Sequence, residues 1–485
     1  MLNIKQLTVK KAKELIDKKE IEPKELVKAS YDRIKKADDK VEAFNTILEQ
    51  NDIMAQLDSA KKGNLYGLPY SLKDNICTKD ILTTCSSKIL YNYRPPFNAT
   101  VAEKLKNSGG VLMGKTSMDE FAMGSSNENA AFKQTKNPWD LTRVPGGSSG
   151  GPAASVASGE VLFALGSDTG GSIRQPASLC GLVGLKPTYG LVSRYGLVAF
   201  GSSLDQIGPL TKTVEDAAIV LNEIAGHDPK DSTSADKTKT DYTKCLTGDI
   251  KGKKIAMPRQ FFSKDLNKEI RDSIETAIKK MENLGAIVEE VDISFVDYVI
   301  STYYIISSAE AASNLARYDG VRYGLRAENT NGIVDMFTKT RSEGFGKEVK
   351  RRIMLGNYVL SAGYYDAYYL KALKARTVIK REFDEIFKNF DVIVSPTYIS
   401  TAFRFGEKSA SPMEMYLSDI YTVPINIAGL PGISIPCGLD AKGLPIGMQL
   451  IGKPFGEEDI LSMAYAYEKE TGNENLVPEI LGVDR

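Results

Sequence analysis

The sequence predicts an α/β fold in which helices cover a layered β-sheet. Helix-like and strand-like segments alternate along the chain, which is the β–α–β order of a sheet packed against helices. The 485 residues are 42% hydrophobic and 26% charged, proportions typical of a globular protein with a large core. The least patterned stretch, residues 228–249, is polar and lysine-rich. We interpret it as a surface loop within one domain and not as a linker.

Apolar residues recur at helical spacing through residues 5–58, which predicts an N-terminal helical segment at about 1–60. The core of the domain is then expected at about 61–476. In its first half the predicted elements are a strand at 68–73, a helix at 100–107, a strand at 111–113, a helix of small residues at 152–159 and a strand at 161–165.

The same alternation continues toward the C-terminus. Here the predicted elements are a strand at 253–257, a helix at 270–284 that ends at Gly285, a strand at 286–291, a mostly helical stretch at 358–386 and a strand at 392–394. Two last strands, 432–436 and 445–450, are expected to pair across a turn at 441–443.

Charge and cysteine usage narrow the classes of function. The 62 basic and 62 acidic residues balance, so no global field draws the chain to nucleic acid or acidic lipid. Five scattered cysteines form no C-x-x-C pair, which argues against a zinc ribbon or a disulfide scaffold and favours a reducing cytosol. The charged N-terminus lacks a signal-peptide core, and no run of about 18 apolar residues exists. We expect a cytoplasmic protein that does not enter a membrane.

A single histidine, His227, restricts the catalytic chemistry. It follows an apolar helix-like run and opens a polar stretch, so we interpret it as a solvated residue at a helix end. A Ser-His-Asp hydrolase, a multi-histidine metal site and a catalytic histidine pair would all depend on this one residue. Hydrolytic chemistry is therefore expected to use another base.

Residues 109–116, GGVLMGKT, match the phosphate-loop pattern G-x-x-x-x-G-K-[ST]. A phosphate loop needs a strand before it and a helix after it, because its backbone N–H groups curl around the phosphates. Here a helix precedes the motif, and its Val-Leu-Met centre predicts a strand. A nucleotide-binding protein built on Lys115 stays open only as an alternative of a different class.

Two glycine–serine clusters, at 146–151 and 170–172, bracket a predicted helix and strand. Ser148 and Ser149 both satisfy G-x-S-x-G, the pattern of an α/β-hydrolase nucleophile elbow. The elbow needs an apolar strand directly upstream, but residues 137–145 contain two prolines and make a poor strand. We instead expect both serines at the N-terminus of the following helix, one of them as its cap.

Ser172 lies in a different context, after a predicted buried strand and Thr169-Gly170-Gly171. Consecutive N–H groups on a glycine turn form an anion-binding concavity. Each donor to a developing oxyanion contributes roughly 3 kcal/mol. Ser172 is therefore placed like a nucleophile beside its own oxyanion hole.

A serine nucleophile needs a base, and with histidine effectively absent lysine is the remaining choice. Lys73 ends an apolar segment and has the most buried-looking context of the lysines. The alternative is a solvated lysine at a strand end. Burial can lower a lysine pKa by several units from about 10.4, and Ser148 could relay a proton between Ser172 and Lys73.

Three stretches resemble the amidase signature family: YSLKDN around Lys73, PGGSSGGPAAS at 145–155 and GSDTGGSIRQPAS at 166–178. The likeness extends from about residue 7 to 476 and implies one amidase domain, 1–485, with a central mixed sheet flanked by helices. It implies Ser172 as the acyl-forming nucleophile, Ser148 as a bridging serine often preceded by a cis peptide, and Lys73 as the general base. It implies an oxyanion hole made by the N–H groups of Thr169, Gly170 and Gly171, and no metal or organic cofactor.

The stretches 307–324, 348–369 and 415–438 are most similar to the A subunits of amidotransferases acting on Glu-tRNA(Gln) and Asp-tRNA(Asn). This likeness implies a glutaminase in which Arg352 pairs with the carboxylate of glutamine and Asp419 holds its ammonium. Tyr303 would lie in the same pocket.

The same likeness implies that ammonia passes to a B subunit, where ATP and Mg activate the misacylated tRNA, and that a small C subunit bridges the two. Two alternatives stay open. One is a stand-alone amidase acting on a small aliphatic or aryl amide. The other is a surface position for Arg352, as one member of the basic run at 350–352.

Overall fold

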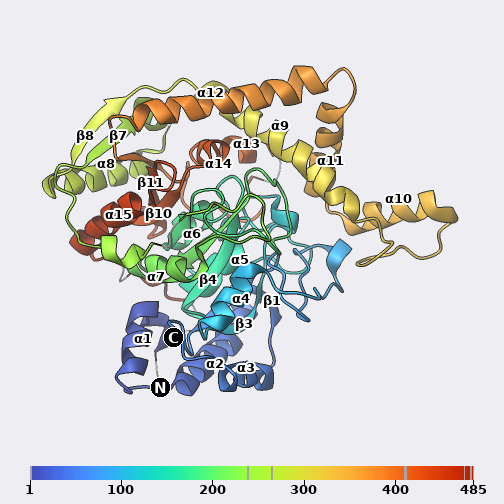
Figure 1. Cartoon of the computed structure of the whole chain (residues 1–485), viewed down its shortest axis with the longest axis horizontal. Helices are drawn as coiled ribbons and strands as arrows, with labels where there is room; N and C mark the ends of the chain where they lie inside the picture. The colour runs from blue at the N-terminus through green and yellow to red at the C-terminus, as the bar shows by residue number, and fades with distance from the viewer. Residues whose placement is uncertain are drawn as a thin grey trace.

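A single mixed sheet runs through the molecule (Figure 1). The protein is described by a computed structural model that covers residues 3–237, 240–263, 266–408, 412–473, 476–480 and 483. Within these residues the eleven strands are, in sheet order, β1 (Phe44–Ile47), β3 (Val111–Thr116), β2 (Pro69–Lys73), β4 (Phe163–Asp168), β6 (Gln206–Thr211), β5 (Val183–Lys186), β10 (Gly432–Leu439), β11 (Pro445–Gly452), β9 (Val392–Pro396), β7 (Lys254–Pro258) and β8 (Ile287–Val291).

The sheet mixes both strand directions. β2 runs parallel to β3 and β4, and β7 runs parallel to β8 and β9. The other neighbouring strands are antiparallel. The predicted α/β fold with a central mixed sheet flanked by helices is confirmed.

Helices surround this sheet. They are α1 (Val9–Asp17), α2 (Pro23–Val41), α3 (Gln50–Asp58), α4 (Thr100–Asn107), α5 (Gly150–Ala157), α6 (Arg174–Cys180), α7 (Val214–Ile224), α8 (Lys268–Asn283), α9 (Val296–Asn314), α10 (Gly332–Gly344), α11 (Lys347–Leu360), α12 (Lys371–Ile386), α13 (Pro412–Leu417), α14 (Val423–Ala428) and α15 (Glu457–Thr471). Among the described residues no helix is long and apolar enough to cross a bilayer.

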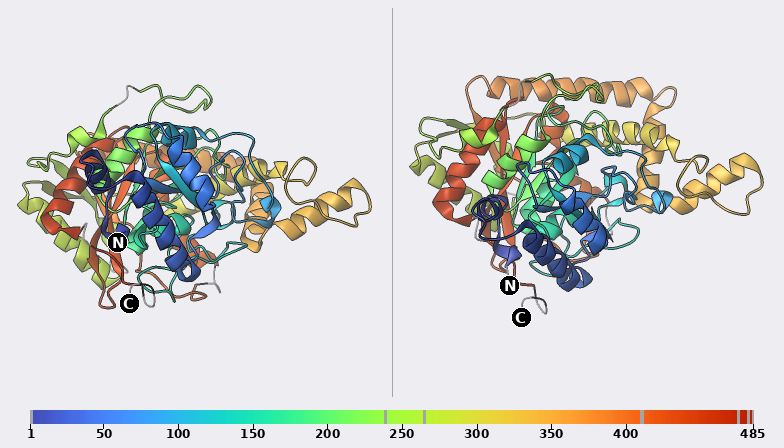
Figure 2. Two further views of the ribbon diagram at one scale, coloured as in Figure 1. Left: turned by 90° about the horizontal axis from the view of Figure 1, so that it is seen from below. Right: turned by 60° about the horizontal axis from the view of Figure 1, so that its bottom comes forward.

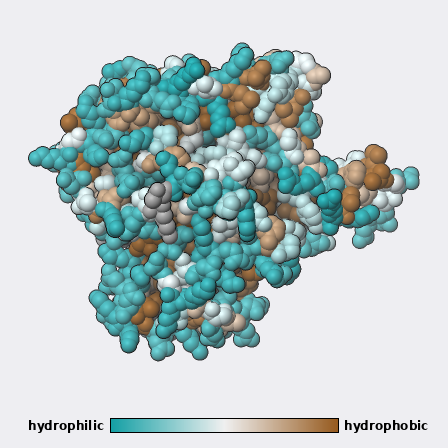
Figure 3. Space-filling view, in the orientation of Figure 1, coloured by the Kyte–Doolittle hydropathy of each residue, from teal (hydrophilic) through white to brown (hydrophobic). Residues whose placement is uncertain are grey.

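Helix α10 projects from the body of the molecule in every view (Figures 1 and 2). The face shown in Figure 3 is mostly hydrophilic, and hydrophobic side chains gather on this projection. Ile333 and Val334, at the start of α10, are 62% and 73% exposed. The arm therefore adds little to the core, which is built around the sheet.

The core lies on both faces of the sheet, as successive residues of the central strands show. Phe163 and Leu165 of β4 pack in one hydrophobic cluster, whereas Ala164 between them packs in another. Leu112 of β3 joins the first cluster, and its neighbour Val111 joins the second. Side chains alternate between the faces of a strand, so helices must cover both sides.

Several predicted elements are confirmed almost to the residue. β2, α4 and the antiparallel pair β10–β11 lie where the local patterns predicted them. The strand predicted at 161–165 begins two residues later and runs to Asp168, so its last residues reach the second glycine–serine cluster.

The N-terminal segment differs from the prediction, because residues 5–58 are not helical throughout. Phe44–Ile47 form β1, an edge strand that pairs antiparallel with β3. Phe44 is fully buried there. Pairing with a strand distant in sequence decides this conformation, and helical spacing in the flanking residues does not reveal it.

Candidate active site

Lys73 is the last residue of β2 and is fully buried. Its Nζ donates hydrogen bonds to Ser148 Oγ at 2.8 Å and to the Ser167 carbonyl oxygen at 3.1 Å. Burial lowers the pKa of Lys73 to about 7, although the nearby carboxylates of Asp119, Asp168 and Asp205 oppose the shift. A substantial fraction of this lysine is therefore a neutral amine at pH 7, which can accept a proton.

The first glycine–serine turn presents Ser148 to this amine. The Gly147–Ser148 peptide bond is cis, as the family resemblance implied. Gly147 has no room for a side chain, because a Cβ there would lie 2.1 Å from Asp119 Oδ2. The Ser148 carbonyl accepts a hydrogen bond from the Asp119 N–H. Close packing against Asp119 thus fixes the backbone that carries Ser148.

The predicted serine cap of α5 is wrong. Ser149 occupies the N-cap position, but its side chain makes no capping hydrogen bond. Its Oγ instead donates to the Ser167 carbonyl at 3.1 Å. The carbonyl at the end of β4 therefore receives hydrogen bonds from both Ser149 and Lys73.

The second turn is anchored by the carboxylate of Asp168, at the end of β4. This carboxylate accepts hydrogen bonds from the Gly171 N–H at 2.8 Å and the Ile173 N–H at 3.1 Å. It also pairs with Arg174 at 3.0 Å, where both side chains are fully buried. Burial alone would raise the pKa of Asp168, but Arg174 outweighs it and holds that pKa well below its usual value.

Both glycines of this turn are required by the space around them. Gly171 has φ +128°, a left-handed conformation that favours glycine. A Cβ at Gly170 would lie 2.5 Å from the Tyr303 hydroxyl. Because the Gly171 N–H already donates to Asp168, Thr169 and Gly170 remain the candidate oxyanion donors. Thr169 is itself fixed by a 2.6 Å hydrogen bond from Oγ1 to Asp205.

Ser172 lies at the end of this turn with 8% of its surface exposed. Its carbonyl accepts the Ser149 N–H at 3.1 Å. Within the described residues its hydroxyl makes no hydrogen bond, so the contact from Lys73 to Ser148 is formed and one from Ser148 to Ser172 is not. Catalytic hydrogen bonds often tighten only when substrate binds.

Ser172 faces a small cavity whose wall carries two opposite charges. The cavity is lined by Ala122, Gly124, Ser125, Gly147, Gly170, Gly171, Ser172, Gln175, Phe200, Tyr303, Tyr304, Arg352 and Asp419. Its volume of about 10 Å³ is close to the space for one water molecule. A larger molecule enters only if part of the wall moves.

Arg352 is a wall residue with only 5% of its surface exposed, so a surface position is excluded. Its Nε donates to Glu348 Oε1 at 2.8 Å. The guanidinium lies over the rings of Phe200, Tyr304 and Tyr416, 4.9 to 5.5 Å from their centroids. Aromatic faces and one carboxylate thus replace the water that a buried cation loses.

Asp419 supplies the negative charge. It accepts hydrogen bonds from the Tyr304 hydroxyl at 2.8 Å and from Ser125 Oγ at 3.1 Å. Burial raises the pKa of Asp419 to about 6, although Tyr304, Arg352 and Ser125 favour the charged form. A cation in the cavity would stabilise this carboxylate further.

Other residues of the site were missed by sequence reasoning. Phe200, Tyr304, Glu348 and Tyr416 come from separate segments and form no motif. One signal was present: Glu348 precedes Arg352 by four residues, the spacing at which opposite charges meet on a helix. Nothing comparable marked the two tyrosines.

The phosphate-loop alternative is wrong, because the centre of that motif is β3, the strand that the sequence predicted there. Lys115 is fully buried in β3 and donates to the Ile76 carbonyl at 2.7 Å and to Thr83 Oγ1 at 2.9 Å. The backbone of this segment pairs with β1 and β2 and does not curl around an anion. His227 is exposed after α7, as predicted.

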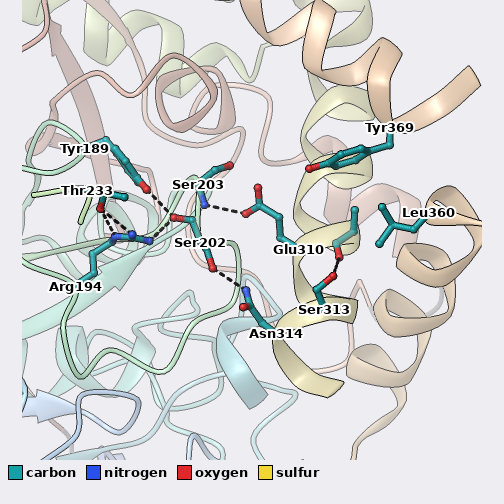
Figure 4. A pocket seen from close by; sticks show the side chains of 11 residues that line it. Tyr189, Arg194, Ser202, Ser203, Thr233, Glu310, Ser313, Asn314, Leu360 and Tyr369 are labelled. Carbon is teal, nitrogen blue, oxygen red and sulfur yellow. Dashed lines mark hydrogen bonds between the residues drawn. The ribbon is translucent and has the colours of Figure 1, made fainter. Parts of the chain in front are cut away.

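A second cavity, of about 420 Å³, lies near the first, along the same helix (Figure 4). Phe200 faces the cavity of Ser172, whereas Ser202 and Ser203 line the second one. Glu310 of α9 accepts the Ser203 N–H there at 2.9 Å. Among the residues predicted for the site, none lines this second cavity.

Comparison with known proteins agrees with this geometry. The family model described as Amidase matches residues 25–461. The A subunit of the glutamyl-tRNA(Gln) amidotransferase of Halothermothrix orenii is 57% identical over 479 residues, which are 99% of this chain and 100% of that protein.

Two solved structures share the whole architecture. The A subunit of the glutamyl-tRNA(Gln) amidotransferase of Thermotoga maritima is 45% identical with a TM-score of 0.84, over 99% of this chain and 98% of that one. A peptide amidase from Stenotrophomonas maltophilia is 28% identical with a TM-score of 0.82, over 99% of both chains. The chain therefore belongs to the amidase family.

Proposed function

We propose that this chain is the glutamine-hydrolysing subunit of an amidotransferase that amidates misacylated Glu-tRNA(Gln). One observation carries the proposal: Arg352 and Asp419 put opposite charges into the wall of the cavity that Ser172 faces. A free amino acid is a zwitterion and needs one partner of each sign. The likeness of the whole chain to the A subunits of glutamyl-tRNA(Gln) amidotransferases supports the same substrate.

The proposed reaction begins with neutral Lys73, which removes a proton from Ser172 through Ser148. Ser172 Oγ attacks the side-chain amide carbon of glutamine, and the N–H groups of Thr169 and Gly170 stabilise the oxyanion. Gly171, whose N–H binds Asp168, keeps the turn in shape. Collapse of the intermediate releases ammonia, which leaves with a proton returned by the same relay.

Water then completes the cycle. It attacks the glutamyl ester on Ser172 with Lys73 again as the base, and glutamate leaves. Arg352 and Asp419 hold the α-carboxylate and the ammonium through both steps, and Tyr303 packs against the oxyanion turn. Because the cavity holds about one water molecule, the wall must open for glutamine and close over it.

The ammonia would be used by partner subunits. We expect a second subunit to activate the glutamate of misacylated tRNA with ATP and Mg, and a small third subunit to bridge the two. Asp-tRNA(Asn) is a further candidate acceptor. The five cysteines are free thiols, which fits a cytoplasmic assembly.

The test is glutamine hydrolysis by the full chain, purified with the proteins that accompany it in its native source. Wild type should release glutamate and ammonia, and mass spectrometry should trap a glutamyl ester on Ser172. The variant Ser172→Ala should form no ester, and wild-type-like turnover by it would contradict the mechanism. Equal hydrolysis of glutamine and a simple aliphatic amide by the wild type would instead indicate a general amidase.

A further inference from the structure

The guanidinium of Arg352 uses one of its three nitrogens within the described part of the chain. Nε donates to Glu348 Oε1 at 2.8 Å, while Nη1 and Nη2 donate to no described residue. Arg352 is nevertheless buried, and it lines the cavity together with Ser172 and Asp419. The two terminal nitrogens are therefore left for whatever enters that cavity, and together they match a carboxylate.

Glu348 is held more firmly than a surface partner would be. It lies one turn before Arg352 on α11 and is itself buried. The Tyr416 hydroxyl donates to Oε1 at 2.6 Å, and Arg351 donates to Oε2. Burial opposes ionisation of Glu348, but Arg352 and Tyr416 outweigh it and lower its pKa. The carboxylate that binds Nε is thus charged and fixed from several sides.

The helix that carries both residues is also fixed against the cavity wall. The Gly346 N–H, just before α11, donates to Glu120 Oε2 at 2.8 Å. A Cβ at Gly346 would lie 2.3 Å from that oxygen, so the approach is close. Ala122, two residues after Glu120, lines the cavity. The first turn of α11 therefore keeps its place relative to the site.

We propose that Glu348 is a positioning residue that holds Arg352 through Nε and directs Nη1 and Nη2 to the α-carboxylate of the substrate. The inference rests on the proposed function and deepens it, since it makes a free α-carboxylate a requirement of the site. A second role for Glu348 would be to neutralise Arg352. The two roles predict opposite signs, because removing a competing negative charge would strengthen carboxylate binding.

The decisive variant is Glu348→Gln, which keeps the shape and removes the charge. Its kinetics are compared on glutamine and on 4-aminobutanamide, which is glutamine without the α-carboxylate. We expect KM for glutamine to rise about 10- to 100-fold with kcat within about threefold, the loss of a charge-assisted contact in uniform binding. Hydrolysis of 4-aminobutanamide should not change.

Three comparisons make the result specific. In an Arg352→Met background, Glu348→Gln should cause no further loss on glutamine, because its effect acts through Arg352. Glu343→Gln is the matched control: it removes one charge from the exposed end of α10 and should leave KM unchanged. Tyr416→Phe removes one hydrogen bond to Glu348 and should raise KM in the same direction, which keeps the proposal testable if Glu348→Gln does not fold.

A KM for glutamine that stays the same or falls in Glu348→Gln would overturn the proposal. An equal loss on both substrates would also overturn it, since that is the mark of a merely structural residue. Failure of the proposed function is a different result. In that case the wild type itself would not prefer glutamine over 4-aminobutanamide, before any change at Glu348.

Discussion

Lys73 and Lys115 lie on neighbouring parallel strands and are both fully buried, yet they meet different partners. Lys115 Nζ lies 3.7 Å from Asp74 Oδ1 and also donates to a backbone carbonyl and a threonine hydroxyl. Lys73 donates to Ser148 Oγ and the Ser167 carbonyl and, among the described residues, has no ion pair. One lysine is a cross-link, and the other is free to exchange its proton with a hydroxyl.

The difference shows that a lowered pKa does not by itself mark a catalytic lysine. Burial lowers the pKa of both residues. Burial also lowers the pKa of Lys186 and Lys212 to about 7, but within the part of the chain that the structure describes these donate only to backbone carbonyls. What separates Lys73 is a serine hydroxyl at 2.8 Å on the path to the cavity.

The largest expected effect is that of Lys73→Met on turnover. Loss of the base should lower kcat for glutamine by about 10³- to 10⁴-fold, near the upper range for general-base catalysis. Lys212→Met is the matched control, because that lysine is equally buried and shares a pKa of about 7. It should retain kcat, measured by glutamate release, while losing stability. Similar turnover losses in both variants would erase the distinction.

Lys115→Met should act on stability and not on chemistry. It leaves the buried carboxylate of Asp74 without its cation, and breaking a buried pair from one side costs about 3–5 kcal/mol. Urea denaturation should show this loss in the free energy of unfolding. The double variant with Asp74→Asn should recover part of it. A stable Lys115→Met protein with no activity would assign Lys115 to the reaction.

Ser148→Ala should lower kcat by roughly 10²- to 10³-fold, because Lys73 then loses its contact toward Ser172. Ser149→Ala removes a neighbouring hydroxyl that, among the described residues, binds only the backbone of Ser167. It should cost about 1 kcal/mol of stability and leave most of the activity. Single-turnover kinetics of ester formation compare the two variants. Equal activity losses would show that the relay is not specific to Ser148.

The pH dependence should carry the smallest and most gradual effect. The pKa of Lys73 is about 7, and only its neutral form accepts a proton, so activity rises with pH through this value. Below it, kcat should fall about tenfold per pH unit as the amine becomes protonated. Asp419, with a pKa of about 6, should add a rise of KM in the same acid range. A flat profile of kcat from pH 5.5 to 8 would contradict lysine as the base.

Local patterns predicted a good part of the fold. β2, α4 and the β10–β11 pair follow from runs of apolar residues bounded by glycine and proline, and such runs act within a few residues. β1 escaped because its four residues become a strand only through β3. The serine cap escaped because the Ser167 carbonyl, from another element, attracts the Ser149 hydroxyl.

For the site, the sequence alone determined which groups are present: two glycine–serine turns, one lysine at a strand end, and no available histidine. Only the tertiary structure decided what these groups can do. Burial lowers the pKa of Lys73, and packing against Asp119 orients Ser148. The cage around Arg352 forms where α9, α11 and α13 converge, far from one another in the chain. Burial and long-range contact are properties of the folded chain, and no local pattern records them.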